Sequence, residues 1–115
     1  MNKKLLNIFV RFNSLHWGNK LPIPDLIYSK KIKECGIYYY ETEIDKKDYV
    51  IKINTNQKGE ELRKTMLHEM CHHAVYINNK KYYKPNSKTK IFPHGKEWKK
   101  EMRKVGFKGK ISRWT

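Results

Sequence analysis

The stretch 59–78 alternates apolar and polar residues with the period of an α-helix, and this pattern constrains the fold more than any other feature. Apolar side chains recur every three or four positions, so they share one face of the predicted helix. These residues are Leu62, Met66, Met70, Ala74 and Ile77. The sequence therefore predicts a helix over 59–78 with one face packed against a core.

Two histidines occupy the opposite face of the same predicted helix. His68 and His72 are four residues apart, so their imidazole rings are about 40° apart around the helix axis and one turn apart along it. Two such rings reach one point, and imidazole nitrogen is a common ligand of Zn²⁺. Glu69 is offset by about 100°, which places its carboxylate beside that point, where a general base is needed. The run 68–72 therefore predicts an HExxH zinc site for hydrolysis, with Glu69 as the base.

A third ligand must come from elsewhere in the chain. The metzincin class places a glycine and a histidine three and six residues after the second histidine. Val75 and Asn78 hold those positions, which excludes that class. His94 is the best candidate because it lies where a loop enters a final predicted helix, and capping of that helix is its alternative role. Glu97 and Glu101 on the same helix are the other candidates.

The rest of the chain predicts two more helices and three short strands. Apolar residues at helical spacing predict helices over 3–13 and 95–104. Runs rich in Ile, Tyr and Val predict strands at Asp25–Ser29, Gly36–Thr42 and Asp48–Asn54. The charged residues Glu43–Lys47 predict a hairpin turn, and residues 17–24 and 79–93 are typical of loops. This order predicts one α+β domain over 1–115 with a small three-stranded antiparallel sheet.

The chain carries a formal net charge of +15, and most of this excess lies in the last third. Residues 80–115 contain 13 Lys and Arg against two acidic residues, which indicates a polyanion partner, DNA first of all. Because lysine outnumbers arginine by 22 to four, compositional bias is the alternative explanation, and RNA or an anionic membrane surface would satisfy the same charge. Aromatic residues in this segment serve either base stacking or packing. The candidate nucleic-acid contacts are Lys80, Lys81, Tyr82, Tyr83, Lys99, Lys100, Arg103, Lys104, Lys108, Lys110, Arg113 and Trp114.

Targeting signals and cysteine usage favour a cytoplasmic protein, with association to the nucleoid if it binds DNA. The sequence has no apolar run of the roughly 20 residues that span a bilayer, and polar residues interrupt the N-terminal segment, which resembles no cleavable signal. Cys35 and Cys71 are too few for a disulfide framework. We expect two reduced, buried thiols, with a single bridge between them as the alternative.

Two further histidines are candidates for minor roles. We expect His16 and His73 to be surface residues. His73 lies about 140° from His68 on the helical wheel, so contact with a substrate oxyanion is its alternative role. The sequence gives His16 no role at the zinc site.

The ordered motifs of this chain resemble those of the SprT/Spartan group of zinc metalloproteases. The block 65–72 resembles the signature LLHEMxHA, and the segment 94–102 resembles HGxxF with the methionine that follows it. The upstream residues 12–38 also resemble the N-terminal half of that domain, so the resemblance covers nearly the whole chain. Two departures are His73 in place of the usual alanine and Trp98 in place of the usual phenylalanine.

The resemblance implies a zincin-like fold, one catalytic Zn²⁺ held by His68, His72 and His94, and Glu69 as the catalytic base. For the Spartan branch it also implies DNA-stimulated cleavage of proteins crosslinked to DNA. We expect a minimal form without the C-terminal zinc ribbon of larger relatives, in which the basic segment 80–115 contacts DNA. The alternative function is a zinc-containing nucleic-acid-binding module without proteolytic activity.

Overall fold

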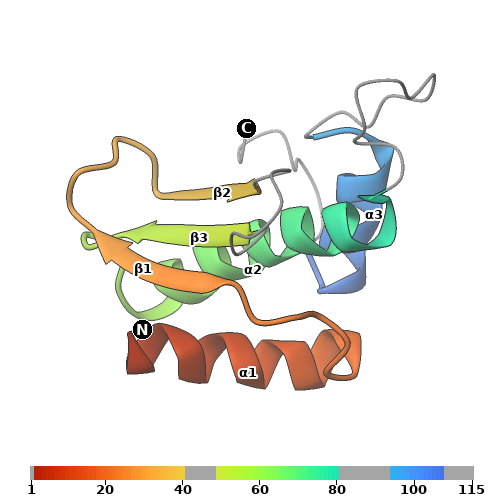
Figure 1. Cartoon of the computed structure of the whole chain (residues 1–115), viewed down its shortest axis with the longest axis horizontal. Coiled ribbons are helices and arrows are strands. Elements are labelled where there is room, and N and C mark those ends of the chain that lie inside the picture. Colours follow the sequence, from red (N-terminus) through yellow and green to blue (C-terminus); the bar gives the residue numbers. More distant parts are fainter. Residues whose placement is uncertain (1, 41–48, 81–93, 108–115) are drawn as a thin grey trace.

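The structure is a computed structural model that describes residues 2–40, 49–80 and 94–107 (Figure 1). Three helices and three strands form an α+β fold in the described residues, as the sequence predicts. The elements are α1 (Lys3–Trp17), β1 (Asp25–Ser29), β2 (Gly36–Tyr40), β3 (Tyr49–Asn54), α2 (Gly59–Asn78) and α3 (Lys96–Lys104). The predicted hairpin turn at 43–47 and most of the predicted loop at 79–93 lie outside the described residues.

The sheet is mixed, so the prediction of an antiparallel sheet is wrong. Its strand order is β1–β3–β2, with β1 parallel and β2 antiparallel to the central β3. The loop between β1 and β2 is held at the end of β3, where the Asn54 amide nitrogen donates to the Ile32 carbonyl at 2.9 Å and the Asn54 backbone N–H donates to the Cys35 carbonyl at 2.8 Å. Because this loop crosses the end of β3, β1 and β2 lie on opposite sides of β3 and do not pair with each other. Residue pattern predicts which segments form strands, but it does not predict which strands become neighbours.

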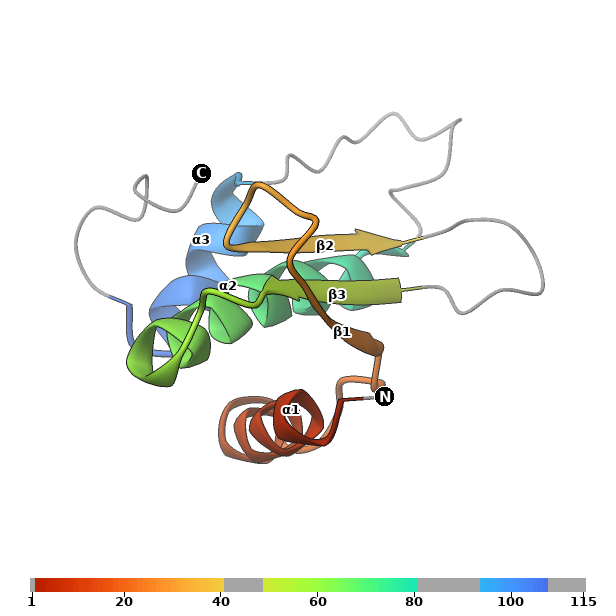
Figure 2. The same ribbon diagram turned by 90° about the vertical axis from the view of Figure 1, so that its left-hand side faces the viewer.

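Helix α2 lies against one face of the sheet (Figures 1 and 2) and supplies more residues to the core than any other described element. From the sheet, Leu26, Ile51 and Ile53 are buried against it. Four of the five predicted core residues of α2 are buried, and Ile77 is half-buried. Buried side chains continue around α2 to its polar face, so α2 is a central helix and not a half-exposed one.

Helix α1 is four residues longer than predicted. A buried asparagine stands where the apolar pattern would need an apolar residue, so the pattern ends before the helix does. Asn13 is 5% exposed, and its side chain accepts from the Leu21 N–H at 3.1 Å and donates to the Leu21 carbonyl at 2.9 Å. This pair fixes the loop after the helix. The helix ends at Gly18, whose left-handed backbone (φ 56°) favours glycine.

Helix α3 packs on α2 through two fully buried side chains, Trp98 and Met102, one turn apart as predicted. The structure has both cysteines free. Cys71 is buried, but Cys35 is exposed on the loop before β2, so its predicted burial is wrong. No helix in the described ranges is long and apolar enough to cross a membrane.

Replacement of Asn13 by alanine should destabilise the fold. Both backbone polar groups of Leu21 would lose their partner in a buried environment, which costs about 1–3 kcal/mol. Urea unfolding measures the loss, and Asn7→Ala on the exposed side of the same helix is the control. Equal free energies of unfolding for the two variants would contradict the role given to Asn13.

Candidate metal centre

Three histidine nitrogens meet at one point beside α2. His68 and His72 lie one turn apart on α2, and their Nε2 atoms are 3.3 Å apart. His94, from the segment that enters α3, places its Nε2 atom 3.1 Å from that of His72. Among the described residues, these three form a group whose ligand atoms all lie within 4.8 Å of one another. Glu97 and Glu101, the alternative third ligands, do not belong to it.

The spacing of these nitrogens fits a tetrahedral metal ion. A Zn–N bond of 2.0–2.1 Å places two ligand nitrogens about 3.3–3.4 Å apart in a tetrahedral site. The two measured nitrogen–nitrogen distances, 3.3 and 3.1 Å, are close to this value. The three rings could therefore hold one metal ion, and they leave a coordination position for water or substrate.

The ring of Trp98 contacts all three histidine rings of this centre. Its ring centre lies 5.0 Å from that of His68, 5.4 Å from that of His72 and 4.7 Å from that of His94. It stacks on His72 at an angle of 17° and meets the other two rings edge to face. The sequence marks Trp98 as a departure from the usual phenylalanine of the family motif, and the structure shows it buried between α3 and α2. In the structure it also orients all three candidate ligands.

Burial keeps the three imidazoles neutral. It lowers the pKa of His68 to about 4, with a smaller contribution from His94. It lowers the pKa of His72 to about 3, with smaller contributions from the two neighbouring histidines, and it also lowers the pKa of His94. Neutral imidazole offers the lone pair that binds a metal. The centre is therefore ready to bind a cation near neutral pH.

Glu69 lies beside the histidines, at the place that its helical offset predicts. Its Oε2 atom is 3.7 Å from His68 Nε2, and the residue is only 4% exposed. Burial raises the pKa of the Glu69 carboxyl to about 8. A carboxyl of this kind can exchange a proton near neutral pH, as a general base and acid must.

Gly36 permits the close approach of strand β2 to Glu69. A Cβ atom at this position would lie 2.7 Å from Thr65 Cγ2 and 3.1 Å from both Glu69 Cγ and Glu69 Oε2. Any side chain there would displace one of these α2 residues. Sequence reasoning noted Gly36 only as part of a family resemblance, because sheet pairing decides which glycine meets the helix.

His73 is fully buried, so its prediction as a surface residue is wrong. Its Nε2 lies 2.7 Å from the Pro22 carbonyl and its Nδ1 lies 2.8 Å from the Tyr38 hydroxyl. Because a carbonyl only accepts, Nε2–H donates to Pro22 and Nδ1 accepts from Tyr38. Both nitrogens are thus engaged within the fold, which leaves none for a substrate oxyanion. His73 connects α2 to β2 and to the loop before β1.

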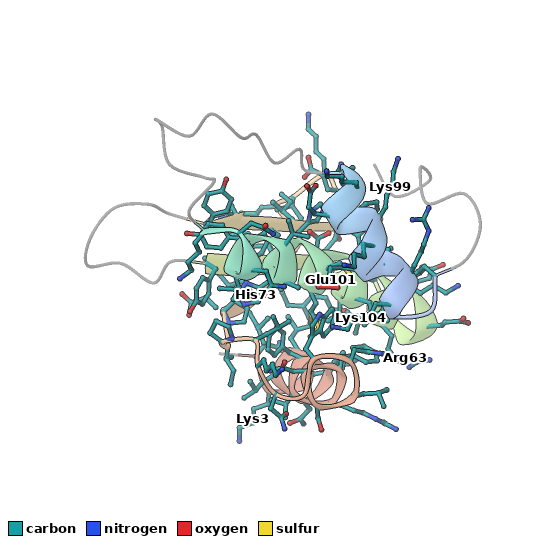
Figure 3. All side chains as sticks on the ribbon, turned by 90° about the vertical axis from the view of Figure 1, so that its right-hand side faces the viewer. Lys3, Arg63, His73, Lys99, Glu101 and Lys104 are labelled. Carbon is teal, nitrogen blue, oxygen red and sulfur yellow. The ribbon has the colours of Figure 1, made fainter. Side chains whose placement is uncertain are left out.

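The structure describes five of the predicted nucleic-acid contacts, and all five are exposed: Lys80, Lys99, Lys100, Arg103 and Lys104. Figure 3 shows Lys99 and Lys104 on α3. The Lys80 ammonium lies 5.8 Å from the ring centre of Tyr49 and 5.7 Å from that of Tyr76. The remaining predicted contacts, Lys81, Tyr82, Tyr83, Lys108, Lys110, Arg113 and Trp114, lie outside the described residues.

The metal-free protein should lose stability as the pH falls below about 6.5. In the unfolded chain histidine binds a proton near pH 6.5, but in the fold His68 and His73 do so near pH 4 and His72 near pH 3. Each of them therefore costs about 2 kcal/mol at pH 5. Glu69 acts in the opposite direction, because its carboxyl keeps its proton in the fold up to about pH 8, so the net loss between pH 7.5 and 5 is about 3 kcal/mol, roughly half of the loss from the three histidines.

Urea unfolding at pH 7.5, 6 and 5 in the presence of a chelator measures this slope. His72→Asn lacks one of the three buried imidazoles of His68, His72 and His73, so its free energy of unfolding should fall less than that of the unmodified protein over the same pH range. A free energy of unfolding that stays constant from pH 7.5 to 5 would contradict the buried, neutral state of these rings.

Comparison with known proteins agrees with the motifs and the geometry. A family model described as the SprT-like family matches residues 5–113. This range includes the histidines of α2 and His94. No curated protein matches the chain. Because the matched range covers nearly the whole sequence, the chain belongs to the SprT-like family.

Proposed function

We propose that this protein is a zinc-dependent metalloendopeptidase. One observation carries the proposal: ligand nitrogens of His68, His72 and His94 lie within 4.8 Å of one another, with the two distances to His72 Nε2 at 3.3 and 3.1 Å, and the Glu69 carboxyl lies beside them. Membership of the SprT-like family supports it, since that family indicates a metalloprotease-like domain. A purely structural metal site has no use for a buried carboxyl whose pKa lies near neutrality.

The chemistry divides between the ion and Glu69. A Zn²⁺ ion held by the three histidines would supply Lewis acidity, which lowers the pKa of water and polarises a peptide carbonyl. Glu69 removes a proton from the attacking water and then donates it to the leaving amine nitrogen. In the metal-free fold, burial raises the pKa of this carboxyl, and the positive charge of a bound cation would lower it again, toward the range where a carboxylate accepts a proton.

Strand β2 offers a place for an extended substrate. It is an edge strand of the described sheet, and its first residue, Gly36, lies against Glu69. A peptide that paired with this edge through main-chain hydrogen bonds would pass the metal centre. Recognition through the main chain implies loose side-chain preference.

DNA is the proposed partner that brings the enzyme to its substrates, in the cytoplasm or at the nucleoid. The exposed cations of α3 and the excess of +11 over residues 80–115 support this part of the proposal. The substrates would then be DNA-bound or DNA-crosslinked proteins. A basic surface of this kind raises local concentration on DNA without reading sequence.

Glu69→Gln should abolish proteolysis and leave metal binding intact, because the amide cannot take a proton but occupies the same space. Metal content by mass spectrometry and cleavage of a histone, with and without DNA, are the measurements. We expect stoichiometric zinc in both proteins and a loss of cleavage of at least 100-fold in the variant. Full activity of Glu69→Gln would refute the assigned base. Zinc and DNA binding without cleavage by the unmodified protein would favour the non-proteolytic module.

Gly36→Ala should reduce cleavage without preventing folding or metal binding. The added methyl group must displace Glu69 or Thr65, and a displaced base transfers protons poorly. We expect kcat to fall by about tenfold or more, with zinc content unchanged. Cys35→Ala, at the exposed neighbouring position, is the matched control and should keep full activity. Equal kcat values for the two variants would contradict the role of Gly36.

A further inference from the structure

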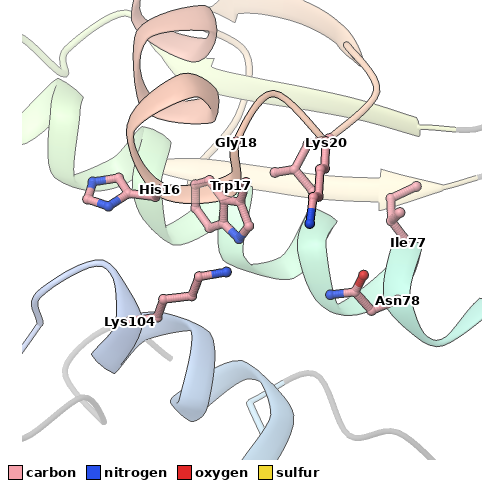
Figure 4. A pocket seen from close by; sticks show the side chains of 8 residues that line it. His16, Trp17, Gly18, Lys20, Ile77, Asn78 and Lys104 are labelled. Atoms are coloured by element: carbon pink, nitrogen blue, oxygen red, sulfur yellow. The ribbon is translucent and has the colours of Figure 1, made fainter.

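A pocket of about 370 Å³ lies where the C-terminal ends of α1, α2 and α3 meet (Figure 4). The lining residues that matter here are His16, Trp17, Lys20, Leu21, Ile77 and Lys104. None of the histidines of the metal centre lines it. Its volume falls within the range of small-molecule sites, which begins near 300 Å³. The metal centre therefore does not account for this pocket.

The lining of the pocket is positively charged. Lys20 and Lys104 are exposed at its rim, and no Asp or Glu is among the described residues that line it. Burial and the nearby Lys104 lower the pKa of His16, which keeps its ring neutral. The Lys104 ammonium lies 5.9 Å from the centre of the Trp17 ring. Two ammonium groups thus border one space without a carboxylate between them.

Trp17 adds a buried donor without an acceptor. The residue is 6% exposed, and its indole Nε1–H has no hydrogen-bond partner among the described residues. Figure 4 shows this nitrogen on the side of the ring that faces Lys104. A buried donor left unsatisfied costs about 1–3 kcal/mol. The indole N–H has no acceptor among the described residues, and an oxygen atom of a ligand beside Lys104 can supply one.

The helix ends around the pocket carry about half a negative charge each, which together is less than the two full charges of the ammonium groups, and one carbonyl at each end is hydrogen-bonded within the fold. The Lys20 N–H donates to the Trp17 carbonyl at 3.0 Å. The Asn79 N–H donates to the Tyr76 carbonyl at 3.2 Å, and the Val105 N–H donates to the Glu101 carbonyl at 3.1 Å. Paired carbonyls have less negative potential to project toward a ligand. The donors of Trp17, Lys20 and Lys104 therefore set the sign of the site.

We propose that this pocket binds a phosphate group carried on an organic molecule, through Lys20, Lys104 and the Trp17 indole N–H. A phosphate oxygen accepts from several donors at once, and lysine is a common partner of phosphate. The pocket is larger than one phosphate needs, and the apolar side chains of Leu21 and Ile77 line the remaining space. The phosphate comes either from a nucleic-acid backbone or from a free nucleotide. The first source deepens the proposed DNA contact, whereas the pocket itself requires neither zinc nor proteolysis.

Titration of the ¹⁵N-labelled full chain with adenosine monophosphate tests the site. The Trp17 indole N–H resonance, identified by its loss in Trp17→Phe, should shift with the nucleotide and not with adenosine, which lacks the phosphate. Lys20→Met and Lys104→Met should each weaken binding about tenfold in calorimetry. Lys33→Met, which removes the same charge from an exposed loop, is the control and should bind as the unmodified protein does. Circular dichroism establishes that each variant is folded.

A single-stranded thymidine oligonucleotide separates the two sources. If the backbone is the ligand, the oligonucleotide shifts the same indole resonance, and each lysine variant loses about one unit of the salt slope of binding. Binding of the nucleotide but not the oligonucleotide supports a free nucleotide. No indole shift with either probe, equal binding of adenosine, or an equal loss in Lys33→Met would overturn the proposal. Repeating the titration in Glu69→Gln keeps the result independent of proteolysis.

Discussion

The fold depends on the burial of polar side chains along α2. His68, Glu69 and His73 are each less than 7% exposed, and a buried polar group without a partner destabilises a protein by several kcal/mol. His73 meets this requirement through Tyr38 and Pro22. At the candidate metal centre the Glu69 carboxyl lies 3.7 Å from His68 Nε2, and a bound cation would satisfy the lone pairs of the imidazoles. The core and the candidate site therefore depend on the same helix, because β2, the loop before β1 and the segment that enters α3 all contact polar residues of α2.

Sequence reasoning predicted the features of α2 that depend on its own period. The bounds 59–78, the buried apolar residues and the shared face of His68 and His72 all follow from 3.6 residues per turn, and the structure has each of them. The strand segments were also predicted to within two residues in the described ranges. These properties are local, since they need no knowledge of what packs against the segment.

The wrong predictions of the strand order and of His73 share a different cause, because both depend on pairing between distant segments. Strand β3 lies between β1 and β2, and no pattern within a strand specifies that neighbour. His73 was expected at the surface because a helical wheel gives an angle but not what covers that angle. In the structure Tyr38 and the Pro22 carbonyl cover it, from segments 35 and 51 residues away in sequence. The position of His94 in the sequence made it a candidate ligand, but the placement of its ring could not be predicted. That placement depends on the packing of α3 on α2 through Trp98.

Two contacts between β2 and α2 together fix the position of the Glu69 carboxyl, the proposed general base. On the strand, Gly36 and Tyr38 are two residues apart, so they share one face with a separation of about 6.6 Å. On the helix, Glu69 and His73 are four residues apart, which corresponds to about 6.0 Å along the axis. Gly36 meets Glu69, and Tyr38 bonds to His73. Because the two spacings nearly match, the hydrogen bond at one end sets the strand at the height where glycine passes the carboxyl at the other. His73 therefore helps to position the Glu69 carboxyl through Tyr38 and β2, although both of its ring nitrogens bond to residues outside the candidate metal centre.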